Sequence, residues 1–279
     1  MPEQPFNNQI HTAMTSKLFS MIITAAMATA CGSTEANQEG FATDSVAYEH
    51  KTHTSEVTLR ADYPKGGNAI LTNAISEYIS EQLGGTYSGP LTTKDSLIAY
   101  YGRQQTTRLD EMAKDMQGSA AAPLYYSEEI KVATETDRYV TYTDLSESFM
   151  GGAHGISTMS GTTFRKSDGR RFGYEMLRNT NSDDFRALLK EGLRQYFTAT
   201  GMEAGNDEQL AQLLLNSNGV DYLPLPQAAP YLTADGMAFV YQPYEIAPYA
   251  AGRPSFTIPY DKIRPFLTET IIKLLDNSN

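Results

Sequence analysis

The segment 239–266 constrains the fold more than any other part of the chain. It opens with Phe239, Val240 and Tyr241, which are residue types favoured in strands. Pro243 and Pro248 follow, and because neither has an N–H to donate, the segment cannot continue as a central strand. Tyrosines recur along it at 241, 244, 249 and 260. Two interpretations remain open: an irregular segment whose rings cover a core, or an ordered aromatic surface loop that binds a partner.

Two motifs resemble a known extracytoplasmic family. The first is the run YEIAPYAAG at 244–252, followed by IPY at 258–260 and a predicted closing helix. The second is GGAHG at 151–155, which follows a predicted strand. Together they resemble the RsiV-like extracytoplasmic domain, a family that includes a lysozyme-binding anti-sigma ectodomain and the non-catalytic domain of PdaC-type peptidoglycan deacetylases. The resemblance covers roughly residues 46–279.

The resemblance implies an α+β fold outside the cytoplasm, but not one shared activity. It also implies a lysozyme-like protein or peptidoglycan as candidate partners. Carried over residue by residue, it indicates these positions for partner contact: Gly151, Gly152, His154, Tyr244, Glu245, Tyr249 and Arg253. We expect no cytoplasmic sigma-binding segment, no transmembrane helix and no metal-dependent catalytic domain, so neither signalling by cleavage nor deacetylation is predicted.

Residues 1–31 are typical of a lipoprotein signal segment. A short basic start at 14–17 makes Met14 the expected first residue, and the apolar run 18–30 is too short to span a bilayer. The run ends in small residues before Cys31, the one cysteine of the chain. We expect Cys31 to be acylated and to anchor the protein; the alternative is a buried structural cysteine. With a single cysteine, no intrachain disulfide is predicted.

Composition and net charge indicate where the protein is located and which classes of partner are excluded. Residues 32–45 are small and polar with little periodicity, which predicts a flexible tether between the lipid and the folded part. The net charge of −11 argues against nucleic acid as a partner and is compatible with a basic protein. We therefore expect a lipid-anchored protein of a bacterial cell envelope, in the periplasm or at the outer membrane.

Residues 46–150 predict an N-terminal α+β half. The stretch 46–63 alternates as one half-buried strand, and it contains His50 and His53, which would point to opposite faces, so no metal site is expected. Asn68 is placed to cap a helix that runs to Leu83. A second helix is predicted at 95–116. A hairpin of strands at 125–136 and 138–149 completes this half.

Residues 151–279 are predicted to form a C-terminal half with a similar order of strands and helices. Its expected elements are a strand at 158–164 turned back at 167–170, helices at 183–197 and 207–215, strands at 231–233 and 237–241, and a last strand at 256–260. Asp261 is expected to cap one final helix, with Pro265 near its first turn. We expect the two related halves to share one curved antiparallel sheet with helices on one face.

The GGAHG run at 151–155 indicates an unusual backbone conformation and not a catalytic site. Its glycines permit positive φ, but it matches neither a dinucleotide-binding fingerprint nor a nucleophile elbow. The structural interpretation is that His154 donates to loop carbonyls and fixes the turn; contact with a ligand is the alternative. No catalytic residue, cofactor or metal is expected.

The sequence thus predicts a binding module that is not an enzyme, with the loop 244–253 and the His154 turn as its contact surface. Two alternatives remain. An envelope glycan hydrolase would need Glu245 together with Asp235 or Asp261, with a raised pKa. A structural or assembly subunit would bury the rings of Tyr244 and Tyr249.

Overall fold

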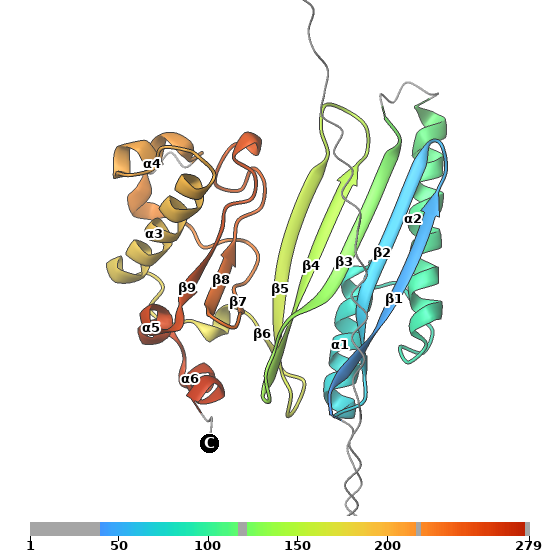
Figure 1. Cartoon of the computed structure of the whole chain (residues 1–279), viewed down its shortest axis with the longest axis horizontal. Coiled ribbons are helices and arrows are strands. Elements are labelled where there is room, and N and C mark those ends of the chain that lie inside the picture. The colour runs from blue at the N-terminus through green and yellow to red at the C-terminus, as the bar shows by residue number, and fades with distance from the viewer. Residues whose placement is uncertain (1–39, 117–121, 216–218, 277–279) are drawn as a thin grey trace, which may run out of the picture. The chain divides into compact units, whose positions relative to one another are not determined.

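The computed structural model describes residues 40–116, 122–215 and 219–276, which lie within one unit, residues 38–279 (Figure 1). Six strands form a sheet in chain order: β1 (Ala42–Lys51), β2 (Ser55–Lys65), β3 (Leu124–Glu135), β4 (Tyr139–Phe149), β5 (Ile156–Arg165) and β6 (Arg171–Phe172). Strands β2 and β3 are parallel, and the other pairs are antiparallel. The predicted α+β class is confirmed.

Two helices connect β2 to β3 and pack on one face of this sheet: α1 (Ala69–Gln82) and α2 (Lys94–Asp115). Asn68 caps α1 as predicted, because its side-chain oxygen accepts from the backbone N–H of Ile70 at 2.9 Å. Alternation along β2 turns Val57, Leu59 and Ala61 into the core beneath the helices, where each is at most 2% exposed. The other face of β2 carries polar side chains.

The expectation of one long strand at 46–63 is wrong, because the chain reverses within it. Thr52 makes the turn: its Oγ1 accepts from the backbone N–H groups of Thr54 and Ser55 at 3.2 and 3.0 Å. β1 therefore pairs antiparallel with β2, and Ala42 faces Lys65 across the pair. Residues 42–45 of the expected tether belong to this edge strand.

A second, three-stranded sheet follows, built from β7 (Tyr231–Leu232), β8 (Gly236–Val240) and β9 (Ser255–Pro259). The helices of this part are α3 (Asp183–Ala199), α4 (Asp207–Leu213), α5 (Tyr260–Ile263) and α6 (Glu269–Asp276). The apolar stripe of α3 packs into a core with Phe239, Tyr241 and Phe256. Close approach is needed there, since a Cβ on Gly192 would lie 2.1 Å from the Phe256 ring.

Side chains rather than a strand ladder join the two sheets. The Gln242 amide accepts from the backbone N–H of Met159 at 3.0 Å and donates to its carbonyl at 2.7 Å, on strand β5. The Leu232 N–H donates to Thr163 Oγ1 at 3.0 Å. The expectation of one shared sheet is therefore wrong. The boundary expected at 150/151 falls between β4 and β5 of the six-stranded sheet.

The predicted final helix is broken. α5 starts at Tyr260 directly after Pro259, so Asp261 lies inside its first turn instead of capping it. A 3₁₀ turn, Arg264–Phe266, then separates α5 from α6. Pro265 lacks the N–H that a continuous helix requires, which is why the helix stops here. None of the helices in the described ranges is long and apolar enough to cross a membrane. Cys31 lies outside the described residues.

Candidate functional site

Three aromatic side chains from two distant loops meet on the surface. His154 lies in the β4–β5 connection, while Tyr244 and Tyr249 lie in the β8–β9 connection. The His154 ring stacks on Tyr249 with centroids 3.8 Å apart, and Tyr244 lies 5.5 Å from Tyr249. The structure thus brings the two motifs singled out in the sequence into direct contact.

Hydrogen bonds fix the orientation of this cluster. The carbonyl of Gly155 accepts from His154 Nδ1 at 2.9 Å and from the Tyr249 hydroxyl at 2.7 Å. Since a carbonyl only accepts, Nδ1 carries the proton, and in the neutral ring Nε2 is left to accept from the Tyr244 hydroxyl at 3.2 Å. His154 therefore donates to a loop carbonyl, as the structural interpretation requires, while its ring stays exposed.

The glycines before His154 adopt the conformation that the sequence indicated. Gly151 and Gly152 have φ values of +90° and +99°. A Cβ on Gly151 would lie 2.5 Å from the end of the Met116 side chain, whereas one on Gly152 would meet open space. The turn therefore needs glycine at 152 for its backbone conformation and at 151 for packing as well.

Glu245 serves as a structural acceptor within the β8–β9 loop. Its two carboxylate oxygens accept from the backbone N–H groups of Gln227 and Gln242. Asp235 precedes β8 and Glu245 follows it, so the two acids lie at opposite ends of that strand. Asp261 lies in α5, beyond β9. The acid pair that a hydrolase would need around Glu245 is therefore not assembled.

The tyrosines of this segment divide between core and surface. Tyr241 is fully buried, and its hydroxyl donates to the carbonyl of Pro224 at 2.7 Å. Tyr244 is 54% exposed and has a φ of +67°. Positive φ is costly for a bulky residue and is typical of sites where function requires it. Neither burial nor turn geometry explains a tyrosine at 244.

A hollow of about 780 Å³ borders the His154 turn on the face of the sheet opposite α1 and α2. Strand pairing sets its floor in two rows across β2, β3 and β4: Glu56, Tyr125 and Phe149, then Thr58, Ser127 and Glu147. The rings of Tyr125 and Phe149 stack at 6.3 Å, and Tyr125 is 39% exposed. We call this floor with His154, Tyr244 and Tyr249 the aromatic hollow.

Arg253 ties the β8–β9 loop to the same floor. Its guanidinium donates to Ser157 Oγ at 2.8 Å, and Ser157 donates to the Glu147 carboxylate at 3.3 Å. Gly155 also lies close to the floor, since a Cβ there would be 2.7 Å from the Ser148 carbonyl and 3.0 Å from the Tyr125 hydroxyl. Of the predicted contact residues, His154 lines the hollow, Tyr244 and Tyr249 contact the His154 ring, and Arg253 reaches Glu147 of the floor through Ser157.

This arrangement is suited to recognition. Exposed ring faces offer apolar contact, while carboxylates and a guanidinium offer directed hydrogen bonds. No group of three or more His, Cys, Asp or Glu within residues 40–116, 122–215 and 219–276 is placed to hold a metal ion.

Sequence reasoning missed Tyr125, Phe149 and Glu147. All three read as ordinary members of a predicted hairpin. Their neighbours across the strands could not be predicted, because the β3–β4 register shifts between Val132 and Thr134 and the register of β2 against β3 depends on the helical crossover.

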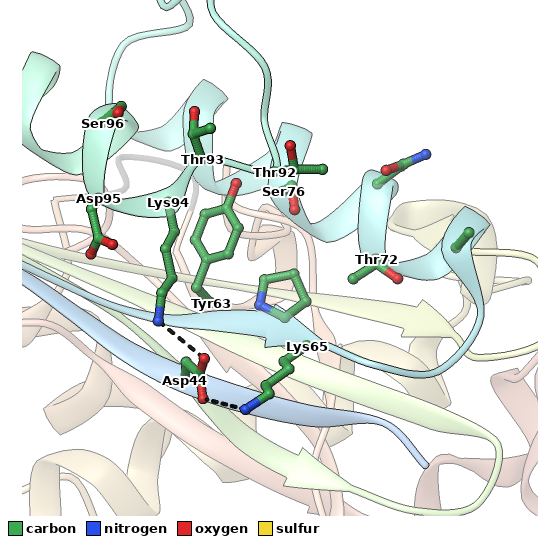
Figure 2. A pocket seen from close by; sticks show the side chains of 13 residues that line it. Asp44, Tyr63, Lys65, Thr72, Ser76, Thr92, Thr93, Lys94, Asp95 and Ser96 are labelled. Atoms are coloured by element: carbon green, nitrogen blue, oxygen red, sulfur yellow. Dashed lines mark hydrogen bonds and ion pairs between the residues drawn. The ribbon is translucent and has the colours of Figure 1, made fainter. Parts of the chain in front are cut away.

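A second hollow of about 640 Å³ lies between β2 and the start of α2 (Figure 2). Asp44 reaches Lys94 at 3.1 Å and Lys65 at 3.4 Å, and the hydrogen bond from Lys94 lowers the pKa of the Asp44 carboxyl. Because these charges satisfy one another on the surface, the second hollow is the weaker candidate.

Comparisons with known proteins agree with this fold. Residues 180–261, which include the β8–β9 loop but not the His154 turn, match a family described as "Protein of unknown function (DUF3298)". The crystal structure of a member of that family from Bacteroides fragilis NCTC 9343 has a TM-score of 0.64 and 21% identity, and the match covers 87% of this chain and 100% of that one. A DUF3298 family protein from Pseudomonas aeruginosa PAO1 has a TM-score of 0.57 and 17% identity, covering 84% of this chain and 97% of that one. A search of curated proteins gave no match.

Proposed function

We propose that this chain is a binding module of the bacterial cell envelope and that the aromatic hollow holds a glycan. The observation that supports this most is the exposed ring of Tyr244, which is kept at positive φ beside His154 and Tyr249. A strained backbone conformation such as this positive φ is kept where the surrounding structure holds it and function requires it.

The chemistry of the hollow fits a sugar chain. One face of a pyranose ring is lined by C–H groups, which pack on aromatic rings such as Tyr125 and Phe149. Its hydroxyls both donate and accept, and they need partners such as the Glu147 carboxylate and the Arg60 guanidinium, which line the same hollow. A flat ring pair flanked by charged side chains supplies both kinds of contact.

The envelope location rests on the sequence. The proposed acylation of Cys31 would anchor the chain to a membrane, and residues 32–41 would separate the anchor from β1. The resemblance of 244–252 and 151–155 to RsiV-like domains supports peptidoglycan as the glycan and a lysozyme-like protein as the competing partner.

Two other functions compete with glycan binding. A structural subunit needs the rings only for packing, which does not account for the exposure of Tyr244. The glycan hydrolase considered above needs Glu245 as a free acid, but backbone amides already occupy both of its carboxylate oxygens. We therefore propose binding without catalysis.

Calorimetric titration with a soluble N-acetylglucosamine tetramer, and separately with lysozyme, tests the proposal. The protein is the chain without residues 1–30 and with Cys31→Ser. We expect Tyr125→Ala to weaken binding of the tetramer by about tenfold or more. The matched control is Tyr222→Ala, at a tyrosine that is 66% exposed on a different part of the surface. If the protein bound lysozyme but not the tetramer, and Tyr125→Ala weakened lysozyme binding by a similar factor, the ligand of the aromatic hollow would be a protein and not a glycan.

A further inference from the structure

Two acidic side chains are buried side by side in the six-stranded sheet. Glu128 on β3 and Asp144 on β4 are 2% and 8% exposed. Asp144 faces Ile130 across the strand pair, and Glu128 faces Ser146, so the two acids are diagonal neighbours on the helix-covered face. One oxygen of Asp144, Oδ1, is buried without a hydrogen-bond partner.

Ion pairs in the described ranges include neither carboxyl. On β3, the Tyr126 hydroxyl donates to Glu128 Oε2. From α1, Tyr78 faces the pair, and Asp144 contributes, after burial, to the raised pKa of its phenol. Arg171 of β6 lies over the Tyr78 ring but pairs with Glu81. Asp110 of α2 accepts from Ser55 on β2 at 2.6 Å.

Two buried carboxylates without a paired cation are strongly disfavoured together. Burial raises the pKa of Glu128, and the neighbouring Asp144 carboxylate raises it further. Burial also raises the pKa of Asp144. The two groups therefore titrate as one unit that retains a proton at neutral pH.

Tyr126 connects this unit to the aromatic hollow. Its side chain lies on the helix-covered face, where the hydroxyl bonds to Glu128, and its backbone joins it directly to Tyr125 on the floor of the hollow. Loss of the shared proton would leave two adjacent negative charges. Their repulsion, and the stronger hydrogen bond from the Tyr126 hydroxyl to a full carboxylate, would shift Tyr126 and, through the backbone of β3, the adjacent Tyr125 on the floor.

We propose that release of the proton shared by Glu128 and Asp144 regulates the aromatic hollow through Tyr126. The inference rests on the proposed function for the consequence in ligand binding, but not for the movement of Tyr126 itself. In the protonated state the floor has the geometry described above. In the deprotonated state the floor is displaced and holds its ligand less tightly.

The movement can be measured in the free protein. NMR of ¹³C-labelled carboxyl and tyrosine ring carbons would follow Glu128, Asp144, Tyr125 and Tyr126 through neutral to alkaline pH. We expect the two tyrosine rings to shift with the same midpoint as the carboxyl pair. Glu128→Gln should abolish that shift, and Glu129→Gln, at a half-buried neighbour on the opposite face, should retain it.

Tyr126→Phe provides the second variant, because it keeps the acid pair but removes the hydroxyl link. The pair should still titrate, while the Tyr125 ring should not follow it. The proposal would be overturned if the Tyr125 chemical-shift change persisted unchanged in Tyr126→Phe. It would also be overturned if the ring-carbon shifts of the wild type did not follow the midpoint of the carboxyl pair.

Binding of the N-acetylglucosamine tetramer separates this inference from the proposed function. We expect affinity to fall by about tenfold between about pH 7 and about pH 9 in the wild type, and by less than about twofold in Tyr126→Phe. Absence of tetramer binding at every pH would contradict the proposed function and leave the ring titration as the test of the link. Binding with equal pH dependence in both proteins would contradict the link alone.

Discussion

The ring of His154 lies nearly parallel to the ring of Tyr249, with centroids 3.8 Å apart and planes inclined by 20°. The pair joins the β4–β5 turn to the β8–β9 loop, and both side chains bond to the carbonyl of Gly155. Segments that are far apart in the sequence thereby form one wall of the aromatic hollow.

The His154 turn depends more on its backbone than on its imidazole. Gly152→Val would place a β-branched residue at a φ of +99°, and we expect it to lower the free energy of unfolding by about 2 kcal/mol or more. His154→Ala removes an exposed stack and should cost about 1 kcal/mol. Urea denaturation of both variants is the measurement. A larger loss in His154→Ala would show that the ring, not the glycine, holds the turn.

The Gln242 amide holds the two sheets together. Gln242→Ala would leave the N–H and carbonyl of Met159 without this partner, and we expect it to lower the free energy of unfolding by about 2 kcal/mol. Gln195→Ala is the matched control, because its amide bonds only to Glu191 on an exposed helix surface. Equal thermal stability of the two variants would contradict this role for Gln242.

Stability should depend on pH through Glu128. Burial, and then the neighbouring Asp144 carboxylate, raise the pKa of Glu128 above its ordinary 4.5, so above that pH the folded protein binds more protons than the unfolded chain. Stability therefore falls as pH rises from about 4.5 through the raised pKa of the pair, by on the order of a few kcal/mol. Glu128→Gln should flatten that decline in denaturation curves, and Glu129→Gln should not. A decline that is the same in all three proteins would assign the effect to other groups.

Membrane attachment should depend on Cys31. Cys31→Ser removes the only thiol, and we expect the protein to move from the detergent phase to the aqueous phase in Triton X-114 partition, or to retain its signal segment. Mass spectrometry of the mature N-terminus checks the acyl chains directly. Membrane recovery of a processed Cys31→Ser protein at the wild-type level would contradict the lipid anchor.

Local signals predicted most elements well. The Asn68 cap, the Gly84–Gly85 stop after α1 and the periodicity of α3 each depend on residues close in sequence, and each element formed where expected. Errors arose at the Thr52 turn, which is made by a threonine side chain without glycine or proline, and at Pro265, which was placed in the first turn of one helix but separates two.

The site was only partly predictable. Tyrosine, proline and glycine motifs indicated the two loops, and their contact is a tertiary result. Tyr125 and Phe149 entered the site through strand pairing, and Glu128 was not singled out, although it shares one face of β3 with Ile130. Which face of β3 the helices cover decides both cases, and that depends on the parallel pairing of β2 with β3.

The most direct test of the proposed function is Tyr244→Gly. Glycine adopts the φ of +67° without strain, so the variant removes the exposed ring and leaves the loop backbone relaxed. We expect the free energy of unfolding to change by less than about 1 kcal/mol, while affinity for the N-acetylglucosamine tetramer falls by about tenfold or more. A Tyr244→Gly protein that binds the tetramer as tightly as the wild type, or one that loses binding only because it unfolds, would contradict the aromatic hollow as the binding site.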